Sequence, residues 1–544
     1  MRAAAARRPD RHVGTILLSA AVSVALSIVY LLWQPQTLDL SAQTFRADLW
    51  DRYGWVIYND AWYSGHTIPG YSLLYPPLGA WLGPEWLGAI CAVVSAVLFA
   101  TIAVRAYGGR AWLGAVWFGL GSTVSLYGGR ITFGLGITFG LAAVLAIQRR
   151  RPVLGTLAGA AAALASPVAG LFTALAAAAV LLAARLQPIA APSRSALVRA
   201  AWAVALASLL ASAALALAFP TPGFQPFTWD SFLWIPIVCA VCFAVLPVGE
   251  TTLRCAIVLY ALLAIVAFEV ATPFGGNAIR LGSLFAGPVM ALALYGRRPV
   301  VLLLLAAPLL WWQWSATIRD VEAADGDPAT EAAYYEPLVN ELRSVAGTTP
   351  IRVEIPPTRS RWESVYVAED FPLARGWLRQ LEADDFDLFR DGNLTPPAYG
   401  KWLRAHGVDY VAVPSTRLDY LGVDEATLIR TVGLNYLSHV WANEDWSLWR
   451  VDFPEDDSIR PDSVGPDGFT VSTPGPGRYV IRMRYSPYLD IVSGEGCIEP
   501  GEEAGTTILT VPAGIGQQEV DVRASFSLGG LMRREPSCSG AGAG

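Results

Sequence analysis

Long apolar runs alternate with short polar or basic segments over the first 315 residues of the chain. Runs of this length are typical of helices that cross a hydrocarbon layer about 30 Å thick. We expect spans at 14–34, 87–104, 111–127, 131–148, 152–165, 167–185, 200–219, 231–248, 253–270, 281–296 and 299–315. The pattern therefore predicts a polytopic α-helical membrane domain over residues 1–315, with its first exterior loop at 35–86.

Residues 152–185 allow two interpretations, because they form either one long helix or two short ones. The Ser166-Pro167 pair favours a break, and one helix would be about 50 Å long. With two spans here, 15 arginines of the membrane domain fall on one side and four on the other, whereas one span gives 10 and nine. The positive-inside rule selects about 11 spans, an N-terminus in the cytoplasm and an exterior C-terminal region, in the plasma membrane.

After Thr317 the pattern becomes that of a soluble domain. Helical periods at 331–347 and 396–407 alternate with a buried strand at 408–413 and a hairpin at 439–453. This order predicts an exterior α/β domain over 316–455. Short strands separated by Pro/Gly turns then predict a β-sandwich within 456–544, whose last residues, "SGAGAG", are expected to be disordered.

Composition agrees with this division. Hydrophobic residues make up 54% of the chain and charged residues 15%, and the net charge of −6 is unevenly distributed. Nine acidic residues lie in 1–315 and 36 lie after it, and no basic face indicates a nucleic-acid partner. Because Cys497 and Cys538 both lie in the exterior β-rich region, we expect a disulfide between them.

The first exterior loop holds candidates for chemistry at the membrane surface. Asp48 can act as a general base towards a sugar hydroxyl, and Asp51 and Asp60 are alternatives. His66, in the Gly/Pro-rich turn "SGHTIPG", is a candidate for proton transfer or hydrogen bonding. The many aromatic residues of the loop would either stack on a sugar ring or form the aromatic belt of a bilayer interface.

Two arginines on the exterior side depart from the positive-inside trend. Arg130 follows Gly-Gly in "YGGRITFGLG", and Asn277 and Arg280 follow Gly-Gly in "FGGNAIRLGS". A guanidinium beside exposed backbone amides suits a phosphate, since it donates two hydrogen bonds at once. The alternative is that both arginines pair with loop aspartates or lipid headgroups.

The architecture and several phrases resemble known families. A multi-spanning block, an Asp-bearing first exterior loop and an exterior C-terminal domain resemble the GT-C superfamily of membrane glycosyltransferases. More closely, the chain is similar to a group of actinobacterial polytopic membrane proteins, some of which carry transporter labels. The phrases that carry this similarity are "FRADLW", "AWYSGHTIPGYSLLYPPL", "GGRITFGLG", "GGNAIRLGSL", "RVEIPPTRSRWESVYVAEDFPLARGWLRQL" and "YVAVP".

The GT-C resemblance implies a polyprenyl-phosphate-linked sugar as donor, a cell-envelope glycan or lipid as acceptor, and a first-loop aspartate as base. Asp48 is the first choice because it lies in "RADL". Trp362 and Glu363 in the soluble region would bind the acceptor or cap the site, unless they serve ordinary domain packing. A divalent metal would suit carboxylates and phosphate, although no ligand set stands out.

Two further functions remain open. A transporter would place binding residues near mid-membrane on broken helices, and here the centres of the predicted spans are nearly free of charge. A scaffold for envelope assembly would use the soluble region for binding without catalysis. We therefore expect a glycosyltransferase, with a transporter or a non-catalytic scaffold as the alternative.

Overall fold

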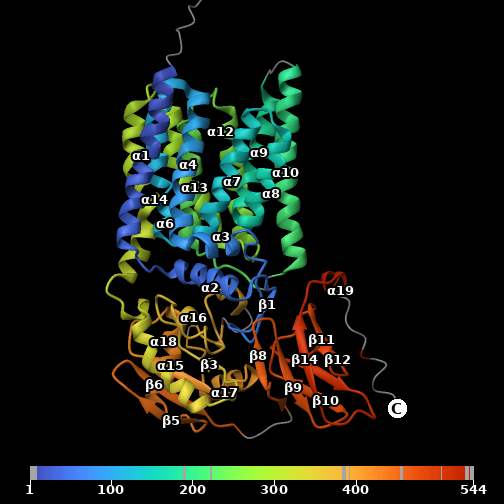
Figure 1. The fold of residues 1–544 in the computed structure, drawn as a ribbon. Coiled ribbons are helices and arrows are strands. Elements are labelled where there is room, and N and C mark those ends of the chain that lie inside the picture. Colours follow the sequence, from blue (N-terminus) through green and yellow to red (C-terminus); the bar gives the residue numbers. More distant parts are fainter. Residues whose placement is uncertain are drawn as a thin grey trace, which may run out of the picture. The chain divides into compact units, whose positions relative to one another are not determined.

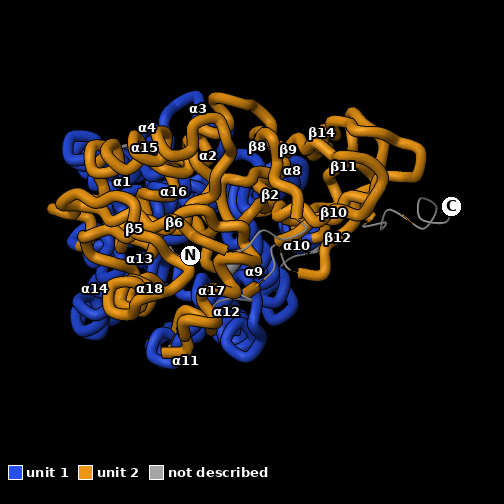
Figure 2. The backbone as a smooth tube through the Cα atoms, turned by 90° about the horizontal axis from the view of Figure 1, so that it is seen from below, with its two compact units in different colours: residues 1–43, 71–216, 224–322 blue, residues 44–70, 217–223, 323–544 orange. Residues whose placement is uncertain are grey.

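The computed structural model of the protein describes residues 9–187, 191–220, 223–382, 387–390, 392–453, 458–503, 505–532 and 538. The chain divides into two compact units (Figure 2). Unit 1 comprises Met1–Gln43, Tyr71–Ala216 and Phe224–Glu322, and unit 2 comprises Thr44–Gly70, Leu217–Gly223 and Ala323–Gly544. Part of the predicted first loop is thus clustered with the C-terminal half of the chain, far away in sequence.

Unit 1 consists of long apolar helices (Figure 1). Each predicted span coincides with helix, the third as a pair of consecutive helices. The helices are α1 (Pro9–Trp33), α4 (Pro84–Tyr107), α5 (Trp112–Gly121), α6 (Val124–Tyr127), α7 (Ile131–Gln148), α8 (Pro152–Ala165), α9 (Pro167–Leu186), α10 (Ala191–Ala218), α11 (Trp229–Val245), α12 (Thr251–Glu269), α13 (Ile279–Leu294) and α14 (Pro299–Ala324). Within the described ranges, eight helical stretches are long and apolar enough to cross a membrane, and α8 and α11 are apolar but shorter. The protein is a polytopic helical membrane protein.

Prolines and glycines set the breaks between these helices. Ser166 is extended (φ −159°, ψ 115°) and α9 begins at Pro167, so the predicted break within 152–185 is confirmed. Gly108 has a positive φ of 61° and ends α4, after which α5 packs back against α4. Helix α14 continues to Ala324, beyond the predicted end of its span at residue 315.

Small residues allow close contact between the helices of unit 1. A Cβ on Gly119 would lie 2.5 Å from the backbone oxygen of Ser19, so α1 and α5 can approach only because residue 119 is glycine. The Ser19 hydroxyl donates a hydrogen bond to the Ala115 carbonyl at 2.6 Å. Such contacts replace the hydrophobic driving force that is missing between helices in lipid.

The first part of the C-terminal region alternates helices and strands, as predicted. Its four-stranded sheet has the order β3-β4-β6-β5, with β3 and β4 parallel and the other pairs antiparallel. The elements are α15 (Ala332–Ala346), β3 (Val353–Glu354), α16 (Glu363–Tyr366), α17 (Pro396–Ala405), β4 (Tyr410–Pro414), α18 (Tyr420–Thr431), β5 (Leu437–Ala442) and β6 (Trp446–Val451). Helices α17 and α18 and strand β4 share a buried core.

Two further four-stranded sheets follow, with orders β12-β13-β10-β7 and β11-β14-β9-β8. Each buries a row of apolar residues, among them Val471 and Val522 in one sheet and Ile481 and Leu509 in the other. A disulfide joins Cys497 to Cys538. The elements are β7 (Ser458–Ile459), β8 (Ser463–Gly465), β9 (Gly468–Thr473), β10 (Gly477–Ile481), β11 (Leu489–Ser493), β12 (Cys497–Pro500), β13 (Thr507–Val511), β14 (Gln518–Ala524) and α19 (Leu528–Leu531). The end expected to be disordered, 539–544, lies outside the described residues.

The segment predicted as one loop, 35–86, contains regular structure. It forms helix α2 (Leu38–Tyr53), a short hairpin of β1 (Tyr58–Asn59) and β2 (His66–Thr67), and helix α3 (Tyr75–Leu82). In unit 2, Phe45 of α2 stacks on the buried Trp62 with ring centroids 4.2 Å apart. Trp62 in turn donates a hydrogen bond from its indole to the Ser364 carbonyl at 3.1 Å, so a partner about 300 residues away helps to hold this segment. The sequence did not predict helix α2.

Candidate functional site

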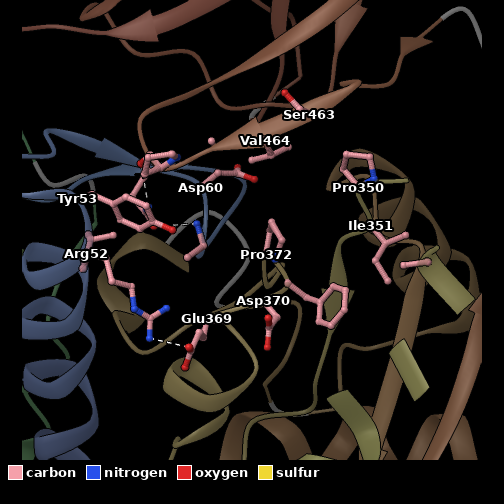
Figure 3. A pocket seen from close by; sticks show the side chains of 18 of the residues that line it. Arg52, Tyr53, Asp60, Pro350, Ile351, Glu369, Asp370, Pro372, Ser463 and Val464 are labelled. Carbon is pink, nitrogen blue, oxygen red and sulfur yellow. Dashed lines mark hydrogen bonds and ion pairs between the residues drawn. The ribbon is translucent and has the colours of Figure 1, made fainter. Parts of the chain in front are cut away.

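Unit 2 contains a cavity of about 500 Å³ (Figure 3). Its lining comes from within five stretches, 45–53, 59–61, 343–351, 365–372 and 462–466, all of which belong to this unit. Phe45, Tyr53 and Phe371 supply aromatic surface beside polar groups. The volume lies in the usual range for sites that bind small molecules.

Carboxylates outnumber guanidinium groups in this lining. Both lining arginines are already paired, since Arg52 lies 2.7 Å from Glu369 (Figure 3) and Arg343 lies 2.8 Å from Asp370. The lining contains five acidic residues and two arginines, namely Asp48, Asp60, Glu369, Asp370, Asp462, Arg52 and Arg343. Electrostatically, the cavity is suited to neutral or cationic ligands and not to an anion.

Asp48 lines the cavity from helix α2 and is half-buried. Its negative charge is close enough to Tyr366 to affect the pKa of that phenol. Burial first, and then the charges of Glu331 and Asp48, raise the pKa of Tyr366 to about 12. Asp51, an alternative base by sequence, is exposed and is not among the lining residues. Of these two aspartates of α2, Asp48 is therefore the one placed at the cavity.

Asp60, the other alternative, is 2% exposed and holds a buried ion pair. Arg352 donates to both of its carboxylate oxygens, at 3.1 and 3.2 Å. Burial raises the pKa of Asp60, and the charge and hydrogen bonds of Arg352 oppose this shift. The ion pair joins the β1–β2 segment to the α/β part of the unit, and this structural role accounts for the carboxylate.

His66 lies on β2, is 6% exposed and does not line the cavity. Its ring stacks parallel to Trp62, with centroids 5.4 Å apart. Burial, and then the charge of Arg46, lower the pKa of His66 to about 3. The imidazole is therefore neutral near pH 7. The structure does not bring His66 to the cavity beside Asp48, and the sequence hypothesis of proton transfer acquires no geometric support.

The predicted phosphate ligands lie in unit 1. Arg130 donates to Asp39 at 2.6 Å and to Asp320 at 2.5 Å, so two carboxylates compensate its charge. This is the aspartate pairing that the sequence left open as an alternative. Asn277 lies in a short 3₁₀ turn, Gly275–Ala278, where its amide donates to the Pro273 carbonyl at 3.4 Å.

Arg280 differs from Arg130, although the two are close enough to interact electrostatically. Its guanidinium lies 5.4 Å from the centroid of the Phe133 ring. Among the described residues, no carboxylate lies within ion-pair distance of Arg280. The structure therefore brings both predicted arginines into one neighbourhood of unit 1 and leaves Arg280 as the better anion ligand of the two.

The Gly-Gly pairs before these arginines have a packing role in unit 1. Gly129 has a positive φ of 68°, and a Cβ there would lie 2.4 Å from the backbone nitrogen of Leu40. A Cβ on Gly276 would lie 2.7 Å from the carbonyl oxygen of Pro226. From the sequence, these glycines were expected to let the backbone approach a ligand closely. In the structure they let it approach other segments of the protein's own backbone.

Trp362 and Glu363, predicted to bind the acceptor, are buried in unit 2 with exposed fractions of 2% and 4%. Glu363 accepts hydrogen bonds from the backbone nitrogen and the hydroxyl of Thr358, at 3.2 and 2.5 Å. Trp362 stacks on Tyr366 with centroids 5.3 Å apart. Neither lines the cavity, and domain packing, the alternative considered from sequence, accounts for both.

Sequence reasoning missed Glu369 and Asp370, which lie only a few residues further along and do line the cavity. The signal was available, because these two consecutive acidic residues directly precede Phe-Pro. Asp462 was also missed, and its sequence context of alternating Pro, Asp and Gly offered no signal. In the part of the chain that the structure describes, no three His, Cys, Asp or Glu residues are grouped to hold a metal ion.

Comparison with known proteins adds no assignment: no family model matches the sequence, and no curated protein matches it.

Proposed function

We propose that the protein is a membrane glycosyltransferase that moves a sugar from a polyprenyl-phosphate donor to a cell-envelope glycan or lipid. The observation that carries this proposal is the position of Asp48, half-buried in the lining of a cavity of about 500 Å³ with aromatic residues beside it. Aromatic faces and carboxylates together suit a polyhydroxylated ring. The architectural resemblance to GT-C enzymes supports the same reaction class.

In this mechanism the Asp48 carboxylate accepts the proton of an acceptor hydroxyl. The hydroxyl oxygen then attacks the anomeric carbon of the donor sugar, on the face opposite the phosphate. The bond between the anomeric carbon and the phosphate oxygen breaks, and the polyprenyl phosphate leaves with the electron pair. Configuration at the anomeric carbon inverts, and Asp48 later returns its proton to solvent.

The group that the cavity binds in this proposal is a neutral saccharide, carried by the acceptor glycan or lipid. Both arginines of the cavity are paired with carboxylates, Arg52 with Glu369 and Arg343 with Asp370. An anionic acceptor would have to displace one of these carboxylates and would also meet the charge of Asp48. A neutral glycan needs only hydrogen bonds and stacking, which the lining supplies.

For the donor phosphate we propose Arg280 as the principal ligand, with Arg130 and Asn277 beside it in unit 1. Arg280 is favoured because Arg130 already donates to Asp39 and Asp320. A planar guanidinium donating two hydrogen bonds suits a phosphate at the end of a lipid chain. A divalent metal stays a prediction of the sequence, without assigned ligands.

The proposed topology has 11 spans in the plasma membrane, a cytoplasmic N-terminus and an exterior C-terminal region. A helix at each predicted span and the 15-to-four division of the arginines support it. In this orientation the catalytic aspartate faces the exterior, where a sugar carried by a lipid phosphate replaces a nucleotide sugar.

The experiment compares the wild type, Asp48→Asn and Asp51→Asn in membrane vesicles, using a panel of radiolabelled polyprenyl-phosphate pentoses and hexoses. Asp51 is the matched control, since it lies on the same helix but outside the cavity. We expect Asp51→Asn to transfer label like the wild type and Asp48→Asn to lose about 100-fold or more. Equal transfer by Asp48→Asn, or no transfer by the wild type from any donor, contradicts the proposal. Accumulation of label inside the vesicles without transfer would favour a transporter.

A further inference from the structure

The C-terminal part of unit 2 exposes an apolar surface that the proposed catalytic site does not use. Phe526, Leu528 and Met532 are 55%, 71% and 57% exposed. The stretch that carries them, "ASFSLGGLM" (524–532), contains no charged side chain. It includes α19, which lies at one end of the two sheets formed by β7 to β14 (Figure 1); we call these two sheets the sandwich. We call Phe526, Leu528 and Met532 the apolar tip.

The apolar tip adjoins the chain segment that continues helix α10. In unit 2 the Tyr488 hydroxyl donates to the Ala218 carbonyl at 2.6 Å, and Ala218 is the last residue of α10. The rings of Phe219, Tyr488 and Phe526 form a cluster with centroid separations of 5.5, 5.8 and 6.3 Å. The sandwich therefore contacts the chain at the residues where helix α10 ends.

Helix α10 is one of the helices long and apolar enough to cross the bilayer. The residues that end such a helix lie at the membrane–water interface, where Tyr and Trp side chains are enriched. Because Ala218 and Phe219 touch Tyr488 and Phe526, the covalent chain itself brings the apolar tip to that interface.

We propose that the apolar tip inserts into the lipid leaflet at the end of α10, and so attaches the sandwich to the bilayer surface. Uncharged, exposed apolar side chains on a short helix beside an aromatic cluster suit the boundary between headgroups and acyl chains. The occupant of this surface is lipid, not a second copy of the chain. The sandwich is thereby held at the membrane in addition to its covalent link to the α/β part.

The test places a bimane fluorophore on Leu528→Cys in the full chain, reconstituted into phosphatidylcholine vesicles. The matched control is Val423→Cys on α18, an exposed apolar position with a 47% exposed side chain. The free cysteines that the structure describes are all buried, which favours labelling at the new site. A second variant, Met532→Cys, repeats the measurement at another position of the apolar tip.

We expect nitroxide-labelled lipids to quench bimane at 528 and 532 several-fold more strongly than at 423, and aqueous iodide to show the opposite order. If 528 and 532 match 423 with both quenchers, the apolar tip lies in water and the proposal is overturned. Protection from both quenchers would also overturn it, because protein would then cover the surface.

Discussion

At the scale of single residues, unit 2 contains several arginines buried with carboxylates. Arg352 pairs with Asp60, Arg361 with Asp419, and Arg375 with both Glu354 and Glu425. Removing one member of such a pair leaves an uncompensated charge in the interior and is strongly destabilising. A buried charged residue here is therefore not by itself evidence of function, and Asp60 has such a structural partner although it lines the cavity.

Glu363 provides a test of this structural interpretation through pH. Burial raises its pKa from the ordinary 4.5 to about 7, although Thr358 and Arg361 act in the opposite direction. Because the folded pKa is above the unfolded one, the stability contributed is fully present below pH 4.5 and is lost as the pH rises towards 7. Glu363→Gln keeps the shape of the side chain but cannot ionise. It should therefore remove the part of the pH dependence of the free energy of unfolding that Glu363 contributes, up to about 3 kcal/mol.

The measurement is hydrogen exchange of the amides around 354–366 in the solubilised full chain at pH 5 and pH 7. The wild type should lose protection relative to Glu363→Gln as the pH rises. An equal change in both proteins would show that the carboxyl group does not change its protonation over this range.

At the scale of elements, the β1–β2 hairpin is held by a segment that lies about 300 residues away in sequence. The backbone nitrogen of Tyr63 donates to the Leu373 carbonyl at 3.1 Å, and that of Leu373 donates to the Ala61 carbonyl at 2.8 Å. The indole of Trp62 donates to the Ser364 carbonyl at 3.1 Å. These bonds place the segment after α2, and with it one wall of the cavity, within unit 2.

Trp62 of the β1–β2 hairpin can pack in this position only because residue 376 is a glycine. A Cβ at position 376 would lie 2.2 Å from the Trp62 ring, so Gly376→Ala must displace the indole. We expect the free energy of unfolding to fall by about 1–3 kcal/mol and hydrogen exchange of the Tyr63 and Leu373 amides to become faster. Gly433→Ala is the control, because nothing lies within 4 Å of the added methyl group. Equal exchange in the two variants would show that Trp62 is not fixed in this position.

At the scale of the whole molecule, the residues of the helical unit 1 and of the mixed helix-and-strand unit 2 alternate along the chain. Unit 2 takes in Thr44–Gly70 and Leu217–Gly223 as well as the region after Glu322. The chain therefore passes between the units several times. Leu217–Gly223 directly continues α10, a helix long and apolar enough to cross a membrane, so the topology of the spans decides which side of the membrane receives unit 2.

The proposed orientation predicts the accessibility of two single positions. Gly109→Cys lies between the second and third predicted spans, on the cytoplasmic side, and nothing lies within 4 Å of an added Cβ. Val423→Cys lies on the exposed surface of unit 2. In intact cells a membrane-impermeant maleimide should label Val423→Cys, whereas Gly109→Cys should react only after permeabilisation. The reverse order would place the N-terminus outside.

The sequence by itself determined where the membrane helices lie and where α8 and α9 separate. Those features depend on local properties: the length of an apolar run, or the φ restriction at Ser166-Pro167. It also identified the alternation of helices and strands after residue 330 and the pairing of Cys497 with Cys538, for which compartment and composition were sufficient.

Only the tertiary structure decided which polar residues have structural partners. Arg130 is paired across 91 residues with Asp39 and across 190 with Asp320, and Glu363 and Trp362 are buried instead of exposed. Helix α2 and the cavity around Asp48 likewise depend on contacts between distant segments. A side chain's partners are set by how the chain packs, and no local pattern encodes that packing.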